Sequence, residues 1–490
     1  MGAPAGPDPL DDGKFQDHCG IVGIAADTQV APYIYYALQA LQHRGQESAG
    51  IVTLDGRFEF RTHKGMGLVD QVFDPESIKR LRGLKGIGHT RYSTSAGSTE
   101  ENAQPQVVMG QRGAIALAHN GNIPNTDHLR EELQGKGWAF YTGNDTEVVV
   151  RLLANKLIKY GDKVEAIVET MKRLDGAYCF TLMIGEDLFA VRDPWGIKPL
   201  CAGRLGEHGH MVASESVALD VLGAEWLRDI EPGEVVRITK EGVETVAKLP
   251  AAKPARCFFE FVYFARPDSF MDGRLNQAVR ERIGMILARE SGIEADLVVP
   301  VPDSGRSHAQ GYAVQSEIPY GEALMKNRYV HRTFIMPTQE SRELNVRLKL
   351  NPVKHLLRGK RVILIDDSIV RGTTMRRIIR MLRDAGASEV HVRIGCPPIV
   401  APCYLGIDMN TRDQLVAAHT DVEGVREHIG ADSLAYLSHE GLYEALGFEE
   451  SDLCTGCITG RYPVHVKDEA LRPEASEASA SLAKTSPRTV

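Results

Sequence analysis

The fold of the second half of the chain is decided by residues 361–374, which read RVILIDDSIVRGTT. Four apolar residues lead into two aspartates, and a short loop of small and hydroxyl residues follows. Beyond the loop, apolar residues recur at i, i+3, i+4 and i+7, which predicts one face of a helix over 375–385. A second apolar run at 390–394 predicts a strand. The order strand, loop, helix, strand indicates a βαβ unit whose loop lies at the carboxyl end of a buried parallel strand.

The residue types of this loop favour a phosphorylated sugar as ligand. Backbone N–H groups at a helix start, with the hydroxyls of Ser368, Thr373 and Thr374 and the flexible Gly372, suit a phosphate. The carboxylates of Asp366 and Asp367 would repel a phosphate, so ribose hydroxyls or a divalent cation are their natural partners. An ordinary strand followed by an Asp-capped helix is the commoner explanation of such residues taken singly.

The whole string resembles the phosphoribosylpyrophosphate (PRPP) motif of type I phosphoribosyltransferases. The resemblance implies that the acidic pair meets the ribose hydroxyls and Mg²⁺, and that the loop binds the 5′-phosphate. It implies substrate contacts for five loop residues: Ser368, Val370, Gly372, Thr373 and Thr374.

Composition excludes several other classes of protein. Of the 490 residues, 43% are hydrophobic and 25% charged, as expected of a globular protein of about three domains. The net charge of −8 argues against general nucleic-acid binding. No apolar run approaches the ~18–20 residues of a membrane span. Residues 1–18 lack the basic start and apolar centre of a secretory signal, so a cytoplasmic location is expected.

The first half carries several polar, glycine-bearing turns beside apolar segments, where active-site groups are commonly displayed. Cys19 opens the apolar run 19–24. The remaining strings are LQHRGQESAG at 41–50, GHTRYST at 88–94, HNGNI at 119–123 and GNDTE at 143–147. A buried cysteine in a strand explains Cys19 alone, and surface ion pairs explain most single arginines and aspartates.

Together these strings resemble the glutaminase domain of class II glutamine amidotransferases, which has the N-terminal-nucleophile (Ntn) hydrolase fold. The resemblance implies an αββα sandwich of two antiparallel sheets between helical layers. It also implies that residues 1–18 are removed, so that Cys19 becomes the N-terminus. Its α-amine, with an ordinary pKa of ~7.7–8.0, then serves as the base for its own thiol.

The same resemblance assigns the other glutaminase roles. Arg91 is expected to pair with the α-carboxylate of glutamine, and Asp145 with its α-ammonium. Asn120 and the Gly121 N–H are expected to form the oxyanion hole. Arg44 is a further expected substrate contact.

The second half also shows an αβ pattern upstream of the PRPP motif. A helix is predicted over 276–290 and a strand over 297–302, followed by Ser304, which the resemblance places near pyrophosphate and Mg²⁺. Residues 326–349 are basic, which usually marks a solvated face. By resemblance they form a flap that closes over the substrate, with Lys326 and Arg328 as contacts.

Eight cysteines in a large chain of this kind are not read as disulfides. Cys454 and Cys457 form a C-x-x-C pair, which alone suggests a redox pair or half of a zinc site. One branch of the amidotransferases binds a 4Fe–4S cluster through cysteines in such contexts. The resemblance therefore implies a cluster held by Cys257, Cys403, Cys454 and Cys457, while Cys396 is not an expected ligand.

Both halves, in this order, resemble the iron–sulfur branch of the glutamine PRPP amidotransferases. The expected organisation is a removed leader (1–18), an Ntn glutaminase domain (19–250), a type I phosphoribosyltransferase domain with a parallel sheet (257–462) and a disordered tail (463–490). The resemblance implies that ammonia from glutamine is channelled to PRPP, giving 5-phosphoribosylamine, the first committed step of de novo purine synthesis. It further implies a homotetramer inhibited by purine nucleotides.

Two other functions stay open on the sequence alone. One is a different class II amidotransferase acting on a sugar phosphate, which the acidic pair Asp366-Asp367 disfavours. The other is a PRPP-sensing regulator without enzymatic activity, which would not need the first half and whose DNA partner the acidic charge disfavours.

Overall fold

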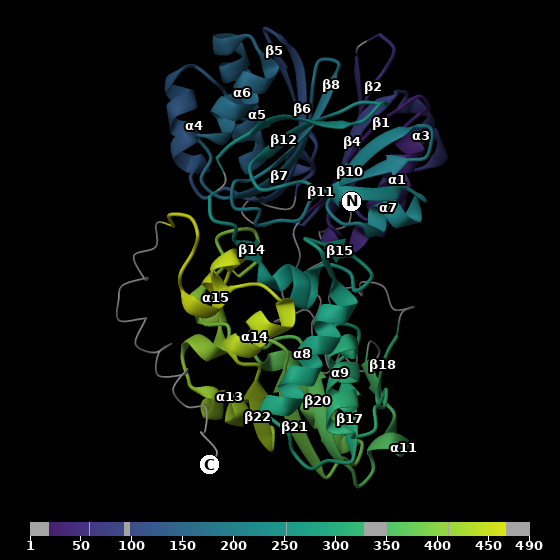
Figure 1. Ribbon diagram of the computed structural model, residues 1–490, viewed down its shortest axis with the longest axis vertical. Helices are drawn as coiled ribbons and strands as arrows, with labels where there is room; N and C mark the ends of the chain where they lie inside the picture. Colours follow the sequence, from purple (N-terminus) through teal and green to yellow (C-terminus); the bar gives the residue numbers. More distant parts are fainter. Residues whose placement is uncertain are drawn as a thin grey trace.

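The computed structural model describes residues 19–57, 59–92, 99–250, 252–327, 350–409 and 411–466. The predicted leader and most of the predicted tail lie outside these ranges. The described chain ends at Val466, and Val464 is buried, inside the segment expected to form the tail. Two halves, residues 19–250 and 252–466, meet along one contact zone, called the seam below (Figure 1).

The N-terminal half contains two antiparallel sheets. The first has the strand order β11 (Glu225–Asp229), β9 (Cys201–Leu205), β10 (Gly209–Ala213), β1 (Gly20–Ala26), β4 (Lys85–Arg91), β2 (Ser48–Leu54) and β3 (Phe60–Met66). The second has the order β13 (Val243–Lys248), β12 (Glu234–Ile238), β8 (Asp187–Arg192), β7 (Ala177–Ile184), β6 (Gly113–Asn122) and β5 (Gln106–Gly110).

Alternating side chains pack these sheets face to face. In β1, Ile21 and Ala25 join a core with Met183 of the other sheet, whereas Val22 and Ile24 point to the outer helices. The outer layers are α1 (Ala31–Ala40), α2 (Val69–Val72), α3 (Pro75–Arg80) and α7 (Val217–Val221) on one side, and α4 (Thr126–Gly135), α5 (Asp145–Tyr160) and α6 (Lys163–Met171) on the other. The predicted αββα sandwich is confirmed.

A parallel sheet forms the centre of the C-terminal half, as predicted. Its order is β17 (Leu297–Pro300), β20 (Arg361–Asp366), β21 (Glu389–Ile394) and β22 (Ser433–Tyr436). The helix after β20 is α12 (Thr373–Asp384), and its buried residues are those of the predicted apolar face. Helices α8 (Asn276–Glu290) and α9 (Arg306–Ser316) pack together, and α9 contacts β17 and β20.

Shorter elements complete this half. They are β14 (Arg256–Cys257) paired with β23 (Leu453–Cys454), the π-helical turn η3 (Glu260–Phe264), β15 (Phe270–Met271) with β16 (Arg274–Leu275), β18 (Leu324–Lys326) with β19 (Leu350–Pro352), α11 (Lys354–Leu357), α13 (Val422–Ile429), α14 (His439–Leu446) and α15 (Gly456–Thr459). Strands β14 and β15 lie at the seam (Figure 1). Within the described ranges, none of the helices has the length and apolarity needed to span a membrane.

Candidate functional site

Cys19 stands at the start of β1, and two hydroxyl groups fix the backbone that follows it. Gly20 N donates to Thr90 Oγ1 at 3.2 Å, and Ile21 N donates to Ser214 Oγ at 3.0 Å. The Cys19 side chain is only 6% exposed. Its φ of +46° lies in the left-handed region, where a non-glycine residue costs roughly 1–3 kcal/mol. The surrounding structure therefore imposes this position on the cysteine.

The Cys19 thiol is surrounded by charged groups but shielded from water. Burial raises the pKa of the Cys19 thiol to about 12, against the opposing effects of the Arg91 charge, the Tyr92 backbone and the Arg44 charge, while Asp145 adds to the rise. The thiol is therefore protonated near neutral pH in this chain, in which the Cys19 nitrogen still belongs to a peptide bond. A base is needed before the sulfur can act as a nucleophile.

A cationic fork and a carboxylate flank the thiol. Arg91 is the last residue of β4 and is buried beside the start of β1. Asp145 opens α5, whose N-terminus is capped by the Asn144 side chain, which accepts a hydrogen bond from Thr146 N at 2.9 Å. Burial alone would raise the pKa of Asp145, but the charge and hydrogen bond of His119, with Thr146, hold it below its usual value. Opposite charges on two sides suit the carboxylate and ammonium of an amino acid.

Asn120 and Gly121 lie at the end of β6, next to this pair of charges. His119 Nδ1 is 3.4 Å from Asp145 Oδ2. Asn120 and Gly121 directly follow His119 in the sequence, so they lie near Asp145 as well. Asn120 is fully buried, yet neither Oδ1 nor Nδ2 of its side chain has a hydrogen-bond partner among the described residues. A buried amide normally finds a partner, so this one is suited to a ligand. Gly121 has φ +138°, and a Cβ there would lie 2.1 Å from Ala177 O.

Arg44 has contacts that differ from those expected. Its guanidinium is fully buried and donates to Glu215 through Nη1 and to both oxygens of Glu260 through Nη2, each at 2.8 Å. Nε faces the backbone oxygen of Cys19 at 3.4 Å. Arg44 therefore contacts the backbone of the nucleophile. A direct contact between Arg44 and the substrate stays a prediction.

The acidic pair lies at the carboxyl end of β20, as predicted. Asp366 and Asp367 are 2% and 1% exposed. Asp366 Oδ1 accepts from Asp367 N at 3.0 Å, and Ser368 Oγ donates to Asp367 Oδ1 at 2.6 Å. Gly372 has φ +75° and precedes α12, so Thr373 and Thr374 occupy the first turn of that helix. The backbone oxygen of Val370 accepts from the N–H of residue 416 at 2.9 Å, which anchors the middle of the loop.

A second loop meets the acidic pair at the same edge of the sheet. Ser304, after β17, lies with Oγ 3.4 Å from Asp366 Oδ1. Asp303 binds two cations, Lys326 Nζ at 3.2 Å and Arg306 Nη1 at 3.0 Å. The predicted contact Arg328 lies outside the described residues, as does most of the predicted flap. Carboxylates, a hydroxyl and cations thus converge where a polyphosphorylated sugar would need them.

The donor set of this edge fits Mg²⁺. Among the described residues, no group of three or more His, Cys, Asp or Glu side chains is arranged to hold a metal ion. Mg²⁺ does not require such a group, because it commonly takes one or two carboxylates together with waters and substrate phosphates. The adjacent carboxylates of Asp366 and Asp367 supply that set.

Four cysteines converge at the seam from three separate segments. Cys257 of β14 and Cys454 of β23 are register partners in a parallel pair, and Cys457 follows in α15. Cys403 interacts electrostatically with all three. Burial raises the pKa of each of these thiols. Four thiolates are the ligand set that a 4Fe–4S cluster takes. Among the described residues, however, these side chains are not arranged as a group that could hold a metal ion, so the cluster stays a prediction.

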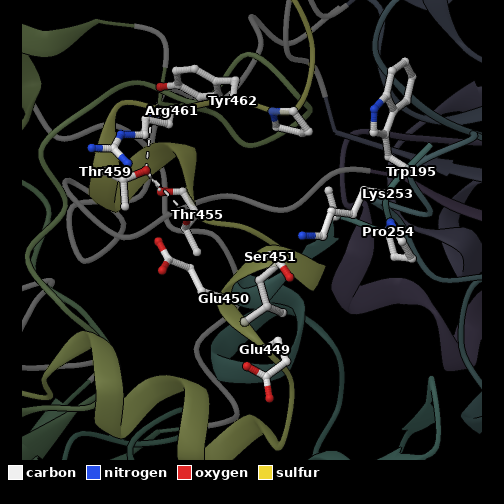
Figure 2. A pocket seen from close by; sticks show the side chains of 13 residues that line it. Trp195, Lys253, Pro254, Glu449, Glu450, Ser451, Thr455, Thr459, Arg461 and Tyr462 are labelled. Carbon is white, nitrogen blue, oxygen red and sulfur yellow. Dashed lines mark hydrogen bonds between the residues drawn. The ribbon is translucent and has the colours of Figure 1, made fainter.

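A cavity of about 630 Å³ borders the cysteine segment (Figure 2). It lies between the linker that joins the two halves, of which residues 253–255 line the cavity, and the C-terminal segment, away from Cys19 and from the acidic pair. Trp195 and Lys253 line one side, and Arg461 and Tyr462 line another (Figure 2).

Buried charges at the seam were missed by the sequence reading, among them Lys198, Glu215 and Glu260. The burial of Glu260 could have been suspected from the sequence, because it is a single carboxylate within the aromatic run FFEFVYF at 258–264. A charge in such a run is rarely buried without a partner. Its partners are distant in sequence, so the pairing itself was not predictable.

Models of two protein families match the chain, one in each half. Residues 89–221 match a glutamine amidotransferase domain, and residues 273–396 match a phosphoribosyl transferase domain. An amidophosphoribosyltransferase of Methanocaldococcus jannaschii is 52% identical over 92% of this chain and 99% of its own length. The enzyme of that name from Bacillus subtilis is 44% identical over 95% of this chain and 98% of its own.

Two solved structures are similar over nearly their whole length. One is described as the allosteric regulatory enzyme of purine biosynthesis, with a TM-score of 0.87, 43% identity, and coverage of 94% of this chain and 99% of that chain. The other is a glutamine PRPP amidotransferase from B. subtilis complexed with ADP and GMP. It has a TM-score of 0.86, 43% identity, and coverage of 92% of this chain and 98% of that chain.

Proposed function

The chain belongs to the amidophosphoribosyltransferase family and is a glutamine-dependent transferase of purine biosynthesis, and we propose how its two halves divide the reaction. The N-terminal half releases ammonia from glutamine at Cys19. The C-terminal half joins that ammonia to C1 of PRPP, giving 5-phosphoribosylamine, pyrophosphate and glutamate. The observation that carries the proposal is the buried amide of Asn120, which has no hydrogen-bond partner among the described residues. It directly follows His119, which contacts Asp145, and the charges of Asp145 and Arg91 act on Cys19.

In the glutaminase half, removal of residues 1–18 frees the Cys19 nitrogen as an α-amine. This amine takes the proton of the thiol, whose raised pKa would otherwise keep it inert. Removal also ends the backbone constraint expressed in the φ of +46°. The sulfur then attacks the amide carbon of glutamine and a C–S bond forms. The C–N bond breaks as the α-ammonium of Cys19 returns its proton to the leaving nitrogen, which departs as ammonia. Water hydrolyses the thioester to glutamate.

Three groups orient this step. Arg91 binds the α-carboxylate of glutamine and Asp145 its α-ammonium. The Asn120 side chain and the Gly121 N–H donate to the oxyanion, a contribution typically worth 10²–10³-fold in rate per donor. A side chain at Gly121 would collide with the backbone of Ala177, so only glycine fits at this end of the strand.

In the acceptor half, Asp366 and Asp367 hold the ribose hydroxyls of PRPP, while Ser368 and residues 370–374 bind the 5′-phosphate. Ammonia forms a bond to C1, and the bond from C1 to pyrophosphate breaks with its electron pair leaving on oxygen. Ser304 and Lys326 face the departing pyrophosphate. Mg²⁺, held through the acidic pair, supplies charge neutralisation for that leaving group when bound.

We also propose that ammonia crosses the seam without entering bulk water. The strand that bears the oxyanion donors touches the second half directly: Asn122 Nδ2 donates to Tyr404 O at 2.8 Å. Gly406 lies so close to Gly121 that an added Cβ would stand 3.1 Å from the Gly121 carbonyl carbon. Free ammonia would be protonated in water and lost as a nucleophile.

The remaining proposals concern cofactor and setting. We assign a 4Fe–4S cluster to the four seam cysteines, where it would link the C-terminal segment to the rest of the molecule. We place the enzyme in the cytoplasm, a setting in which cysteines without disulfides, such as the eight of this chain, are usual. We propose inhibition by purine nucleotides because a similar solved structure is complexed with ADP and GMP, and the homotetramer stays an expectation from the resemblance of the sequence.

Replacing the nucleophile tests the two-site proposal. In Cys19→Ala, glutamine-dependent ribosylamine synthesis is expected to fall by more than about 10³-fold, because no thioester forms. Synthesis from added ammonia should stay within about twofold of wild type, since the acceptor half is untouched. A coupled assay run with each nitrogen source measures both rates. Equal loss with the two sources would contradict the division of the reaction.

A further inference from the structure

Glu260 is a buried carboxylate that the acceptor half presents to the glutaminase half. It begins the π-helical turn η3 and is 1% exposed. Both of its oxygens accept from Arg44 Nη2 at 2.8 Å, and Oε1 also accepts from Lys198 Nζ at 3.0 Å. Burial alone would raise the pKa of Glu260, but the charges of Arg44 and Lys198 lower it below its usual value. The group is ionised and fixed between two cations of the other half.

Arg44 transmits this fixed position to the nucleophile. Its guanidinium is planar, and Glu215 and Glu260 hold its two Nη groups. With that plane set, Nε is directed at the backbone oxygen of Cys19, 3.4 Å away. The Arg44 charge also acts on the Cys19 thiol. A shift of Glu260 would therefore turn the group that supports Cys19.

The turn that carries Glu260 is fastened to the acceptor half. Arg280 of α8 donates to Phe261 O at 2.8 Å through Nε and to Ala265 O at 2.6 Å through Nη2. Helix α8 packs along α9, and α9 begins just after Ser304, at the PRPP edge of the parallel sheet. π-Helical turns are frequent at functional sites. The turn η3 therefore connects the helices beside the PRPP site to Arg44, which contacts the backbone of Cys19.

We propose that Glu260 is a positioning residue for the glutaminase reaction: through Arg44 it sets the backbone of Cys19, so the thiol is aligned with Asn120 and Gly121 only while the two halves are docked. The inference rests on the proposed function of Cys19. Misplacing a reacting group by about 1 Å costs on the order of 10²-fold in rate. Both oxygens of Glu260 are bonded to Arg44, and one also to Lys198, so we assign it no substrate contact and expect the loss in kcat.

A second buried pair across the same seam provides a matched control. Asp272, between β15 and β16, accepts from Arg192 Nη1 at 3.2 Å and Nη2 at 2.9 Å. The remaining contacts of Arg192 among the described residues run to the backbone oxygens of Gly196, Lys198 and Ile230. Like the Glu260–Arg44 pair, the Asp272–Arg192 pair is buried and charged. None of these contacts of Arg192, however, leads to Cys19. Loss of seam packing in general would affect both pairs alike.

The experiment compares Glu260→Gln with Asp272→Asn in the mature, full-length enzyme. In Glu260→Gln we expect kcat for glutamine to fall about 10- to 100-fold, with KM for glutamine and the ammonia-dependent rate within about threefold of wild type. The rate of Cys19 alkylation by iodoacetamide, followed by mass spectrometry, should fall about tenfold. Asp272→Asn should keep all four quantities within about threefold. An equal loss in both variants, or wild-type kcat and alkylation in Glu260→Gln, would overturn the inference.

Arg44→Lys keeps the experiment decisive if Glu260→Gln does not fold. Lysine retains the charge but lacks the planar fork, so the same split between kcat and KM is expected, and wild-type kcat would overturn the inference. Alkylation of the wild-type enzyme separates the two claims. If alkylated Cys19 still supports glutamine turnover, the proposed function fails. If alkylation abolishes turnover and both variants behave as wild type, only the positioning role fails.

Discussion

At the scale of single residues, the glutaminase site depends on backbone geometry that few side chains allow. Gly121 has φ +138°, and its missing Cβ leaves room for Ala177 O. Next to it, Asn120 keeps a buried amide without a partner among the described residues. Such an amide lowers stability, so its retention is best explained by donation to a ligand. At these two positions, the features proposed to serve catalysis are also features that lower the stability of the fold.

Gly121→Ala tests that connection. The added Cβ cannot fit 2.1 Å from Ala177 O, so β6 must shift. We expect the free energy of unfolding to fall by about 1–3 kcal/mol. Glutamine turnover should fall about 10²–10³-fold as the oxyanion donors move. Denaturant unfolding and the coupled assay measure the two effects.

Gly113→Ala is the control on the same strand. Gly113 has φ +107°, but a Cβ there would have nothing within 4 Å. Alanine at this positive φ carries a backbone penalty of about 1–2 kcal/mol without the clash. Glutamine turnover in this variant should match wild type, and a loss as large as that of Gly121→Ala would refute the steric explanation.

At the scale of elements, the strand, loop and helix of the acceptor site were predictable, and the seam elements were not. Strand β20 and helix α12 follow from a buried β-branched run and a 3.6-residue repeat, both local signals. The turn η3 has no periodic pattern, and its charge is satisfied by Arg44, far away in sequence.

The acidic pair at the end of β20 should be needed for both nitrogen sources. In Asp366→Asn with Asp367→Asn, we expect the ammonia-dependent rate and the glutamine-dependent rate to fall together, each by about 10²-fold or more, because ribose and Mg²⁺ lose their carboxylates. Asp384→Asn, at the exposed end of α12, should leave both rates unchanged. Undiminished synthesis from ammonia in the double variant would contradict the assignment of the pair.

At the scale of the whole molecule, the C-terminal segment returns to the seam and joins elements that are far apart in sequence. Strand β23 pairs with β14 directly after the linker, and the backbone oxygen of Cys457 accepts from Val400 N at 2.9 Å and Ala401 N at 3.1 Å. The family resemblance indicated which cysteines belong together. The spacing of 257, 403, 454 and 457 could not, because it reflects chain topology and not a local motif.

The cysteine set predicts which thiols hold iron. Enzyme purified without oxygen should contain about four iron atoms per chain, and Cys457→Ala should lower this to less than about one, with a lower Tm. Cys396→Ala should retain its iron, because that thiol is outside the predicted ligand set. Elemental analysis and the visible absorption spectrum measure the cluster directly. Zinc in place of iron, or iron loss in both variants, would contradict the assignment.

The charged seam also limits how such enzymes can be recombined. Arg44 and Lys198 come from one half and Glu260 from the other, so part of the counter-charge at the seam is supplied across it. A chimera with an apolar residue in place of Glu260 would leave Arg44 with Glu215 and take a carboxylate away from two buried cations, at a cost of about 3–5 kcal/mol. We therefore expect exchanges between related enzymes to be tolerated only when both sides of the seam change together, although each half has a core of its own.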